Sequence, residues 1–224
     1  MIAGMNKQLI LNDPVGRLLQ LLEVADFKRI ARIVIGLVGL PGSGKSTLAA
    51  KFVDAVNERT QSKTAVALSM DGFHFSKAAL AQFADPAAAL ARRGAPWTFD
   101  PAGLADKLLQ LRKTPYQSCT WPYFQHGVGD PVADAIVIQP DVKLIIVEGL
   151  YLLHREDGWN VAQLLDECWA LNTPPELAQS RLIARHMASW GLSREQALAR
   201  LALNDDLNAE IVLKTLQSAQ YIIL

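Results

Sequence analysis

The chain has 224 residues, half of them hydrophobic and a fifth charged, and its formal net charge at pH 7 is zero. This length suits one sizeable α/β domain, and the balanced charge gives no field that would attract nucleic acid or an acidic membrane surface. The apolar runs are too short to span a bilayer, and the first residues lack the pattern of a secretory signal. Cys119 and Cys168 are far apart in apolar surroundings, so we expect reduced, buried thiols and a cytoplasmic protein.

Residues 9–31 predict an amphipathic helix, with Asp13 and Pro14 as its cap and first turn. The apolar run at 33–38 then predicts a buried strand, and residues 47–56 predict a helix. Residues 64–69 predict the next strand. Strand, helix and strand at this spacing form a βαβ unit, which indicates a parallel sheet.

Between the first strand and its helix, Gly39 is followed by four residues and then by Gly44, Lys45 and Ser46, the spacing of a phosphate-binding loop. Glycine reaches the φ/ψ values that turn backbone N–H groups around a phosphate, and the helix N-terminus adds the positive end of its dipole. Lys45 is expected to contact the β- and γ-phosphates of a nucleoside triphosphate, and the Ser46 hydroxyl to bind Mg²⁺. The residues expected to bind the nucleotide in this loop are Gly39, Pro41, Gly42, Ser43, Gly44, Lys45, Ser46 and Thr47.

The second half of the chain continues the alternation of strands and helices. Residues 76–98 are irregular and rich in alanine, and Asp100 then caps a helix that ends near residue 113. A capping box at Thr173 begins a helix that ends near residue 190, and a second box at Ser193 begins the next helix. Strands are expected at 135–138, 143–148, 165–171 and 221–224, and either a short strand or an extended loop at 118–124.

Two carboxylates follow predicted strands: Asp71 after the second strand and Glu148 at the end of the 143–148 strand. In open parallel sheets, ligands bind beyond the carboxyl ends of the strands, so both carboxylates are expected beside the phosphate loop. Phosphoryl transfer uses one carboxylate near the metal and another that orients or deprotonates the accepting hydroxyl. Taken singly, Asp71 also fits an Asp-Gly turn and Glu148 a solvated strand end; together with the loop they favour a functional site.

Three further groups of residues have both a functional and a plain structural interpretation. Arg92 and Arg93 fit either contacts to an anionic or polyhydroxy ligand or a solvated pair. The aromatic and imidazole groups at 121–126 fit either a sugar or nucleoside pocket or the edge of a core. Arg181 and Arg185 share one helix face, where they would either stabilise the transferring phosphoryl group or face solvent.

Taken in order, these motifs resemble the phosphoribulokinase/uridine kinase/bacterial pantothenate kinase family of P-loop small-molecule kinases. The phosphate loop alone occurs in many NTPases, whereas the ordered set is specific. Within the family, the chain is most similar to the fructose transport system kinases and to generic nucleoside or sugar kinases. The matching segments are 39–46, 69–74, 93–100, 121–126, 146–149, 181–186 and 204–209.

The resemblance implies a fold and a set of cofactors. The implied fold is a three-layer, nucleoside/nucleotide-kinase-like P-loop NTPase with a mostly parallel central sheet. One kinase domain would cover residues 1–224, with an N-terminal helical segment at 1–31 and a lid-like helix at about 174–192. The implied cofactors are ATP and Mg²⁺.

The resemblance also implies roles for individual residues. Asp71 matches the catalytic base, and Glu148 matches the acidic residue near Mg²⁺. Arg181 and Arg185 match the catalytic arginines of the lid, and Asn208 lies in a segment close to the nucleotide. The residues expected to contact the acceptor are Asp71, His74, Arg93, Asp100, Tyr123 and His126.

We therefore expect a Mg-ATP-dependent kinase that phosphorylates a hydroxyl of a small metabolite, with a sugar such as fructose as the first choice. Pantothenate and a nucleoside are the alternatives; Trp97 and the short chain weigh against pantothenate, and the spacing from Tyr123 to His126 weighs against uridine. A regulatory nucleotide switch or a partner-driven ATPase is the rival class. It is disfavoured because the chain has no Asn-Lys-x-Asp motif and because Gly149, not a second acid, follows Glu148. No nucleic-acid or membrane partner is expected, and a homodimer stays open.

Overall fold

The computed structural model describes residues 8–28, 30, 32–113, 117–125 and 128–224. Its centre is a six-stranded sheet of order β1-β8-β7-β2-β6-β3, in which every neighbouring pair is parallel. This sheet confirms the predicted α/β fold with a mostly parallel centre. Its strands are β1 (Leu9–Ile10), β2 (Ile33–Val38), β3 (Ala65–Ser69), β6 (Leu144–Gly149), β7 (Glu167–Leu171) and β8 (Tyr221–Ile223).

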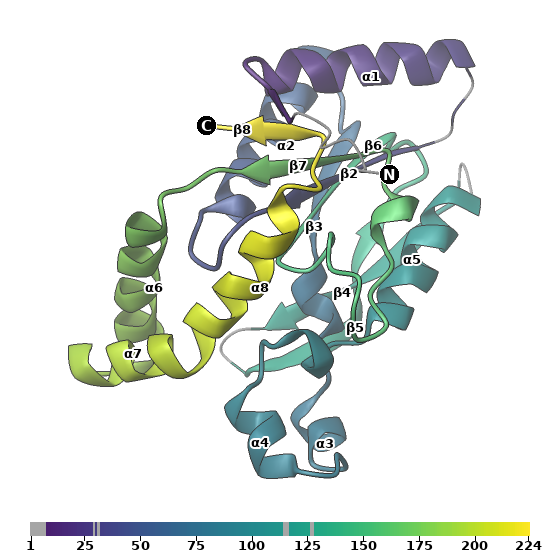
Figure 1. The fold of residues 1–224 in the computed structure, drawn as a ribbon. Helices are drawn as coiled ribbons and strands as arrows, with labels where there is room; N and C mark the ends of the chain where they lie inside the picture. Colours follow the sequence, from purple (N-terminus) through teal and green to yellow (C-terminus); the bar gives the residue numbers. More distant parts are fainter. Residues whose placement is uncertain (1–7, 29, 31, 114–116, 126–127) are drawn as a thin grey trace, which may run out of the picture.

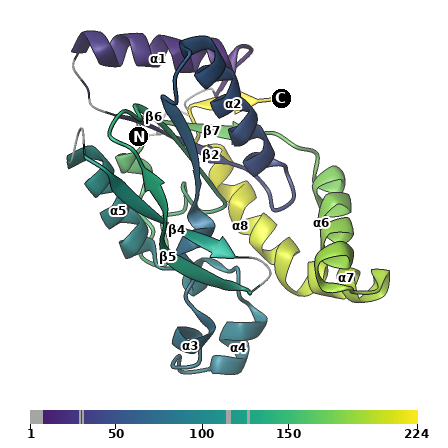
Figure 2. The same cartoon turned by 180° about the vertical axis from the view of Figure 1, so that it is seen from behind.

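Helices cover both faces of the sheet, so the fold has three layers (Figures 1 and 2). Helices α1 (Pro14–Lys28) and α2 (Lys45–Thr60) lie on one face, and α5 (Pro101–Lys113) and α8 (Asp206–Leu216) lie on the other. Helices α6 (Pro175–Trp190) and α7 (Arg194–Arg200) form an arm that extends away from the sheet, and the chain returns to α8 through the π-helical turn η4 (Leu201–Asp205). The remaining short helices are η1 (Met70–Phe73), α3 (Lys77–Leu80), α4 (Pro86–Ala91), η2 (Pro96–Thr98) and η3 (Ala162–Leu164).

Side chains of β2 pack alternately into two hydrophobic clusters, one on each face of the sheet. Ile35 and Leu37 pack with α1 and α2, whereas Val34 and Val38 pack with α5 and α8. Because both faces are covered, the whole strand is buried, which explains why its sequence is a continuous apolar run. Burying each of these side chains stabilises the fold by roughly 1.5–3 kcal/mol.

Strands β4 (Cys119–Gln125) and β5 (Asp130–Ile138) form an antiparallel hairpin, a two-stranded sheet separate from the central one. Trp121 attaches this hairpin to the end of β3: its ring is fully buried, and its indole N–H donates to the carbonyl oxygen of Ser69 at 2.9 Å. The segment at 118–124, for which a strand and a loop were both open, is therefore a strand. The hairpin lies beside the carboxyl end of β3.

The predicted helix at 9–31 was wrong for its first residues, because residues 9–10 form strand β1. The N–H of Leu9 donates to the carbonyl of Gln220 at 3.2 Å, and the N–H of Leu11 donates to that of Ile222 at 2.8 Å. The helix itself begins at Pro14, and the Asp13 carboxylate accepts from the N–H of Gly16 as its predicted cap. Pairing with the C-terminal strand thus overrides the local preference for helix.

The capping box predicted at Thr173 was also wrong, although the helix it was taken to begin is present as α6. The N-cap of α6 is Pro174, which offers no side-chain cap, and the Thr173 hydroxyl instead donates to the carbonyl of Ser43 at 3.1 Å. At Ser193 the predicted capping box is present in full. The difference is that Thr173 finds a partner in the phosphate loop.

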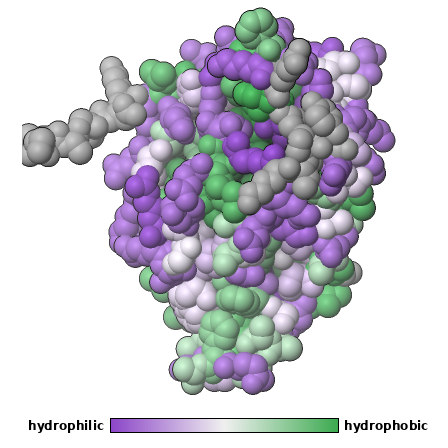
Figure 3. Space-filling model, turned by 90° about the vertical axis from the view of Figure 1, so that its right-hand side faces the viewer, coloured by the Kyte–Doolittle hydropathy of each residue, from purple (hydrophilic) through white to green (hydrophobic). Residues whose placement is uncertain are grey.

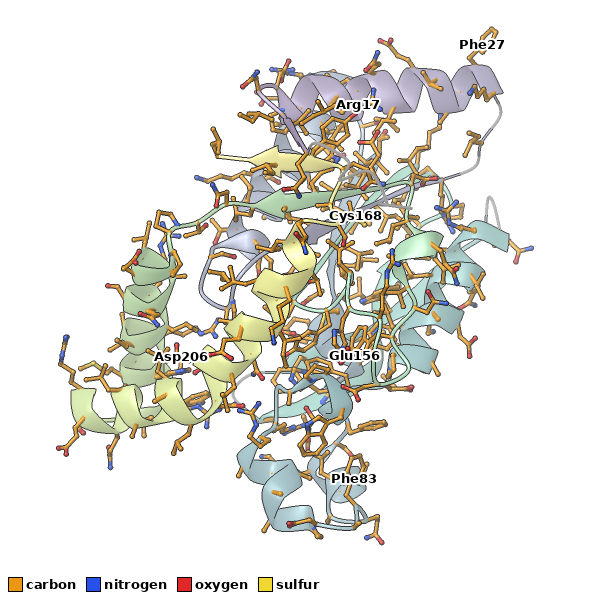
Figure 4. The ribbon with its side chains drawn as sticks, viewed as in Figure 1. Arg17, Phe27, Phe83, Glu156, Cys168 and Asp206 are labelled. Atoms are coloured by element: carbon orange, nitrogen blue, oxygen red, sulfur yellow. The ribbon has the colours of Figure 1, made fainter. Side chains whose placement is uncertain are left out.

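The region at 76–98, expected to be irregular, contains the short helices α3 and α4. They form a lobe at the lower end of the molecule, where Figure 3 shows hydrophobic surface. Phe83 lies in this lobe, where its ring contacts those of Phe75 and Trp97 (Figure 4). No helix among the described residues is both long and apolar enough to cross a membrane.

Both cysteines are buried and neither forms a disulfide, as expected. Burial raises the pKa of Cys168 to about 12, so its thiol stays protonated at neutral pH. Cys168 therefore behaves as a small core residue.

Candidate active site

The phosphate loop connects β2 to α2, and two of its glycines have conformations that other residues avoid. Gly42 and Gly44 have φ angles of 76° and 95°, in the left-handed region. At Gly42, a Cβ atom would also lie 2.3 Å from the carbonyl oxygen of Ala178 on α6. Glycine at this position therefore lets the loop pass close to the base of the α6–α7 arm.

Lys45, the first residue of α2, is buried, and its ammonium donates to the carbonyl oxygen of Leu40 at 3.1 Å. Burial lowers its pKa, and the negative charges of Glu148 and Asp71 act in the opposite direction. The next two residues, Ser46 and Thr47, are exposed at the helix N-terminus. This arrangement offers a cation, hydroxyl groups and free backbone N–H groups to an anionic ligand.

Glu148 is placed beside the phosphate loop by the register of the sheet. In the ladder it lies opposite Leu37 of β2 on one side and Ser69 of β3 on the other. The Ser46 hydroxyl donates to its Oε1 at 3.1 Å. Burial raises the pKa of Glu148; Lys45 opposes this shift and Asp71 adds to it.

The Ser46 hydroxyl and the Glu148 carboxylate fit a Mg²⁺ ion. Both are oxygen ligands, which Mg²⁺ prefers, and their contact shows that they reach a common point. Among the described residues, no three His, Cys, Asp or Glu side chains gather as a metal site. Mg²⁺ bound here would therefore take its other ligands from phosphate oxygens and water, as it does in many kinases.

Asp71 follows β3 in the 3₁₀ turn η1, where its N–H donates to the hydroxyl of Ser69 at 3.1 Å. Its side chain is half-buried, and its charge acts on both Lys45 and Glu148. The three groups predicted from separate strands are therefore neighbours at one edge of the sheet. Their assignment to catalysis stays a prediction.

Arg181 and Arg185 lie at positions i and i+4 of α6, the spacing that puts them on one face, and both are exposed. Arg181 donates to the carbonyl of Ser43 in the phosphate loop at 3.0 Å, and the charge of Arg185 lowers the pKa of Lys45. Both guanidinium groups are thus close to the phosphate loop, and their contact with a transferred phosphoryl group stays a prediction.

Asn208 is buried on α8, and its side chain contacts residues outside the phosphate loop. Its Oδ1 accepts from Arg92 at 3.2 Å and its Nδ2 donates to Asn204 at 3.4 Å. These contacts describe a structural role, and the predicted contact with the nucleotide stays a prediction.

Two of the residues predicted to contact the acceptor, His74 and Asp100, line a cavity of about 540 Å³ between η1, α5 and the hairpin. The His74 ring lies between those of Phe99 and Phe124, with centroids 3.9 and 4.5 Å away. Asp100 caps α5, since its Oδ1 accepts from the N–H of Gly103 at 2.9 Å. Gly72 also lines the cavity, and it directly follows Asp71 in the chain.

The other predicted acceptor residues have different surroundings. Arg93 donates to Asp130 at 2.8 Å and lies over the ring of Phe124, so its positive charge is paired with groups of the protein itself. Tyr123 is 50% exposed on β4, and His126 lies outside the described residues. Their contacts with an acceptor stay predictions.

Two polar residues of this region were not anticipated from the sequence. Thr173 contacts the phosphate loop, and nothing in its local sequence indicates that. Lys107 lines the cavity with Asp100, and helical spacing could have shown this, because positions i and i+7 lie on one face. Its ammonium donates to Thr120 at 2.9 Å and to Asp134 at 3.1 Å.

Comparison with known proteins gives one consistent result. The family model described as "Phosphoribulokinase / Uridine kinase family" matches residues 34–224. A Schizosaccharomyces pombe protein named "Putative uridine kinase C227.14" is 41% identical over 193 residues, which cover 84% of this chain and 81% of that protein. "Uncharacterized protein YggC" of Escherichia coli is 33% identical over 213 residues, covering 95% and 85%. The solved structure of a "putative fructose transport system kinase" from Silicibacter sp. TM1040 has a TM-score of 0.81 and 28% identity, and covers 93% of this chain and 97% of that chain.

Proposed function

Because the chain belongs to the phosphoribulokinase/uridine kinase family and is thus an ATP-dependent P-loop kinase, we propose that it transfers the γ-phosphoryl group of ATP to a hydroxyl of a small metabolite, with a sugar such as fructose as first choice. One observation carries the proposal: the Ser46–Glu148 contact, Lys45 and Asp71 come together from β2, β6 and β3 at one edge of the sheet. A protein that only binds nucleotide does not need a second carboxylate there.

The residues have separate roles in this reaction. The loop N–H groups and Lys45 bind the phosphates, and Ser46 with Glu148 holds Mg²⁺, which neutralises charge on the phosphate oxygens. Asp71 orients the accepting hydroxyl and takes its proton. Arg181 and Arg185 bind the γ-phosphoryl oxygens and help exclude water.

The charges around the cavity support a neutral acceptor with several hydroxyl groups. Among the described residues that line it, Lys107 is the one lysine or arginine, and its ammonium is paired with Asp134. The carboxylates of Asp100 and Asp134 can accept hydrogen bonds from hydroxyl groups, whereas an anionic acceptor would be repelled. The name of the Silicibacter structure is consistent with a sugar.

The runner-up is a nucleoside, which is also neutral, and the name of the Schizosaccharomyces relative supports it. Pantothenate carries a carboxylate, so the charges around the cavity disfavour it. A regulatory P-loop ATPase is the remaining rival; its ATP turnover would not respond to any small acceptor.

The test is the release of ADP from Mg-ATP with fructose, other sugars, uridine, pantothenate or ribulose 5-phosphate. We expect stimulation by one neutral acceptor. Steady hydrolysis that no compound stimulates would overturn the proposal and favour the regulatory ATPase.

We also propose a cytoplasmic location, and light scattering on a sizing column distinguishes a monomer from a homodimer.

A further inference from the structure

Arg92 and Arg93 are consecutive, yet their side chains bind different parts of the molecule. Arg93 donates to Asp130 of the hairpin at 2.8 Å and to the carbonyl of Phe75, after η1, at 2.7 Å. Arg92 instead donates to the carbonyls of Leu203 and Asn204 in η4, at 2.8 and 3.3 Å. Two consecutive residues thus contact both the side of the site formed by η1 and the hairpin, here called the acceptor side, and η4, which follows the α6–α7 arm.

The contact with η4 and α8 is partly buried and reciprocal. Arg92 also donates to the Oδ1 of Asn208 at 3.2 Å, and Asn204 donates back to the carbonyl of Arg93 at 3.0 Å. Both asparagines are nearly inaccessible to solvent: Asn204 is 4% exposed and Asn208 is 2% exposed. The hydroxyl of Tyr151 donates to the carbonyl of Gly94 at 2.6 Å. Residues 92–94 are therefore held by contacts with η4, α8 and Tyr151.

Side-chain contacts connect η4 and the start of α8 to α6. Asp205 contacts the imidazole of His186 at 2.7 Å, and Asp206 accepts from Gln179 at 2.9 Å. Figure 4 shows Asp206 at the start of α8, on the side toward α6. Helix α6 carries Arg181, whose guanidinium contacts the phosphate loop. The series of contacts therefore runs from the acceptor side to the phosphate loop.

Arg92 is well suited to connect these parts. Its planar guanidinium has several donors in a fixed geometry, so it can fix the orientation of η4 as well as its distance. A lysine, with a single flexible ammonium group, does this less well. The turn it binds is π-helical, with the N–H of Asp206 donating to the carbonyl of Leu201, and such turns are uncommon inside helices. A turn of this kind is a natural place for the arm to change its angle.

We propose that Arg92 is a positioning residue that couples the acceptor side of the site to the α6–α7 arm. The proposal rests on the proposed function. An acceptor bound beside η1 and the hairpin reduces the motion of the groups that Arg93 contacts. Because Arg92 is the next residue and binds η4, the motion of η4 is reduced as well, and with it that of α6, which carries Arg181. The arm then places its arginines for transfer when an acceptor is present. ATP is thereby protected from hydrolysis by water when the acceptor is absent.

The test compares Arg92→Gln and Arg92→Lys with Arg194→Gln, a control at an exposed arginine of the same arm. We expect Arg92→Gln to lower acceptor-stimulated kcat about tenfold, with the KM for ATP within about twofold of the wild type. Hydrolysis without acceptor should stay the same or increase, so the ratio of transfer to hydrolysis falls. Arg92→Lys should be intermediate, and the control should match the wild type.

A purely structural role would give a different result. Transfer and hydrolysis would then fall in the same proportion, together with the unfolding midpoint, and that result would overturn the proposal. So would an unchanged ratio in Arg92→Gln.

Hydrogen exchange of the full chain provides a second measurement that does not require an acceptor. With a non-hydrolysable ATP analogue bound, Arg92→Gln should increase exchange in α6, which Arg92 does not touch, as well as in α8. Wild-type exchange in α6 would overturn the coupling even if the kinase reaction is correct. Absence of any acceptor stimulation in the wild type would count against the proposed function instead.

Discussion

The hydroxyl of Ser46 and the carboxylate of Glu148 are in contact at 3.1 Å, although 102 positions separate them in the chain. Ser46 is the second residue of α2, which follows β2 through the phosphate loop, and Glu148 lies near the end of β6, the parallel neighbour of β2. The contact brings a buried carboxylate to the N-terminus of α2, where a phosphate and its metal ion would bind.

Burial of Glu148 gives a pH dependence of stability. Because its pKa is raised, the ionised form is less favourable in the folded protein than in the unfolded chain. Stability should therefore fall as pH rises from the usual value of 4.5 toward the raised pKa, and stay lowered above it. Glu148→Gln should lack this contribution. Urea unfolding of both proteins in EDTA, over a pH series, measures it; parallel curves would contradict the prediction.

Asp71→Asn should separate binding from turnover. The amide keeps the size of the side chain but cannot take a proton, so we expect kcat to fall about a hundredfold or more while ATP affinity stays nearly unchanged. Binding of a fluorescent ATP analogue and acceptor-stimulated ADP release measure the two effects. Asp54→Asn, at an exposed position on α2, is the control. Full turnover in Asp71→Asn would remove this residue from the reaction.

Gly42→Ala should disturb the approach of the phosphate loop to α6. The added methyl would meet the carbonyl of Ala178, and the positive φ angle adds about 1–2 kcal/mol of strain. Gly191→Ala is a matched control, because Gly191 has a φ of 65° but nothing within 4 Å of the Cβ position. We expect the control to lose stability only and Gly42→Ala to lose ATP affinity as well. Equal ATP affinities in the two variants would show that the contact with α6 is unimportant.

Asp100→Asn should distinguish the cap of α5 from a contact with the acceptor. Asparagine caps helices about as well as aspartate, so the unfolding free energy should change by less than about 0.5 kcal/mol. If the carboxylate also binds acceptor hydroxyls, the KM of the acceptor should increase about tenfold or more. Steady-state kinetics with the acceptor found in the ADP-release assay measure this. An unchanged KM would leave Asp100 as a helix cap alone.

Features of the site that depend on local sequence could be predicted. The phosphate loop is set by glycine and lysine at fixed spacing, and the caps at Asp13, Asp100 and Ser193 need only neighbouring residues. The position of Glu148 beside the loop followed from the rule that parallel strands end at one edge.

Features that depend on distant partners could not be predicted. Residues 9–10 have no strand signal of their own, and they become a strand because β8 offers an open edge. The ion pair of Arg93 with Asp130 joins residues 37 positions apart, and no local pattern indicates that partner. The sequence left two partners possible for Arg92, a ligand or solvent, and the structure shows instead that its side chain binds η4. In each case the deciding group lies far away in the sequence.

The hairpin shares no backbone ladder with the central sheet in the described part of the chain. Exchanges of residues in β4 and β5 therefore leave the ladder hydrogen bonds between β2, β3 and β6 untouched, provided that Trp121, whose indole N–H donates to Ser69, is kept. Selection, or a protein engineer, can alter the walls of the cavity that we propose for the acceptor, while the residues proposed to handle ATP are retained. A chimaera that carries the hairpin of a relative with another acceptor is accordingly a practical starting point for changing what this kinase phosphorylates.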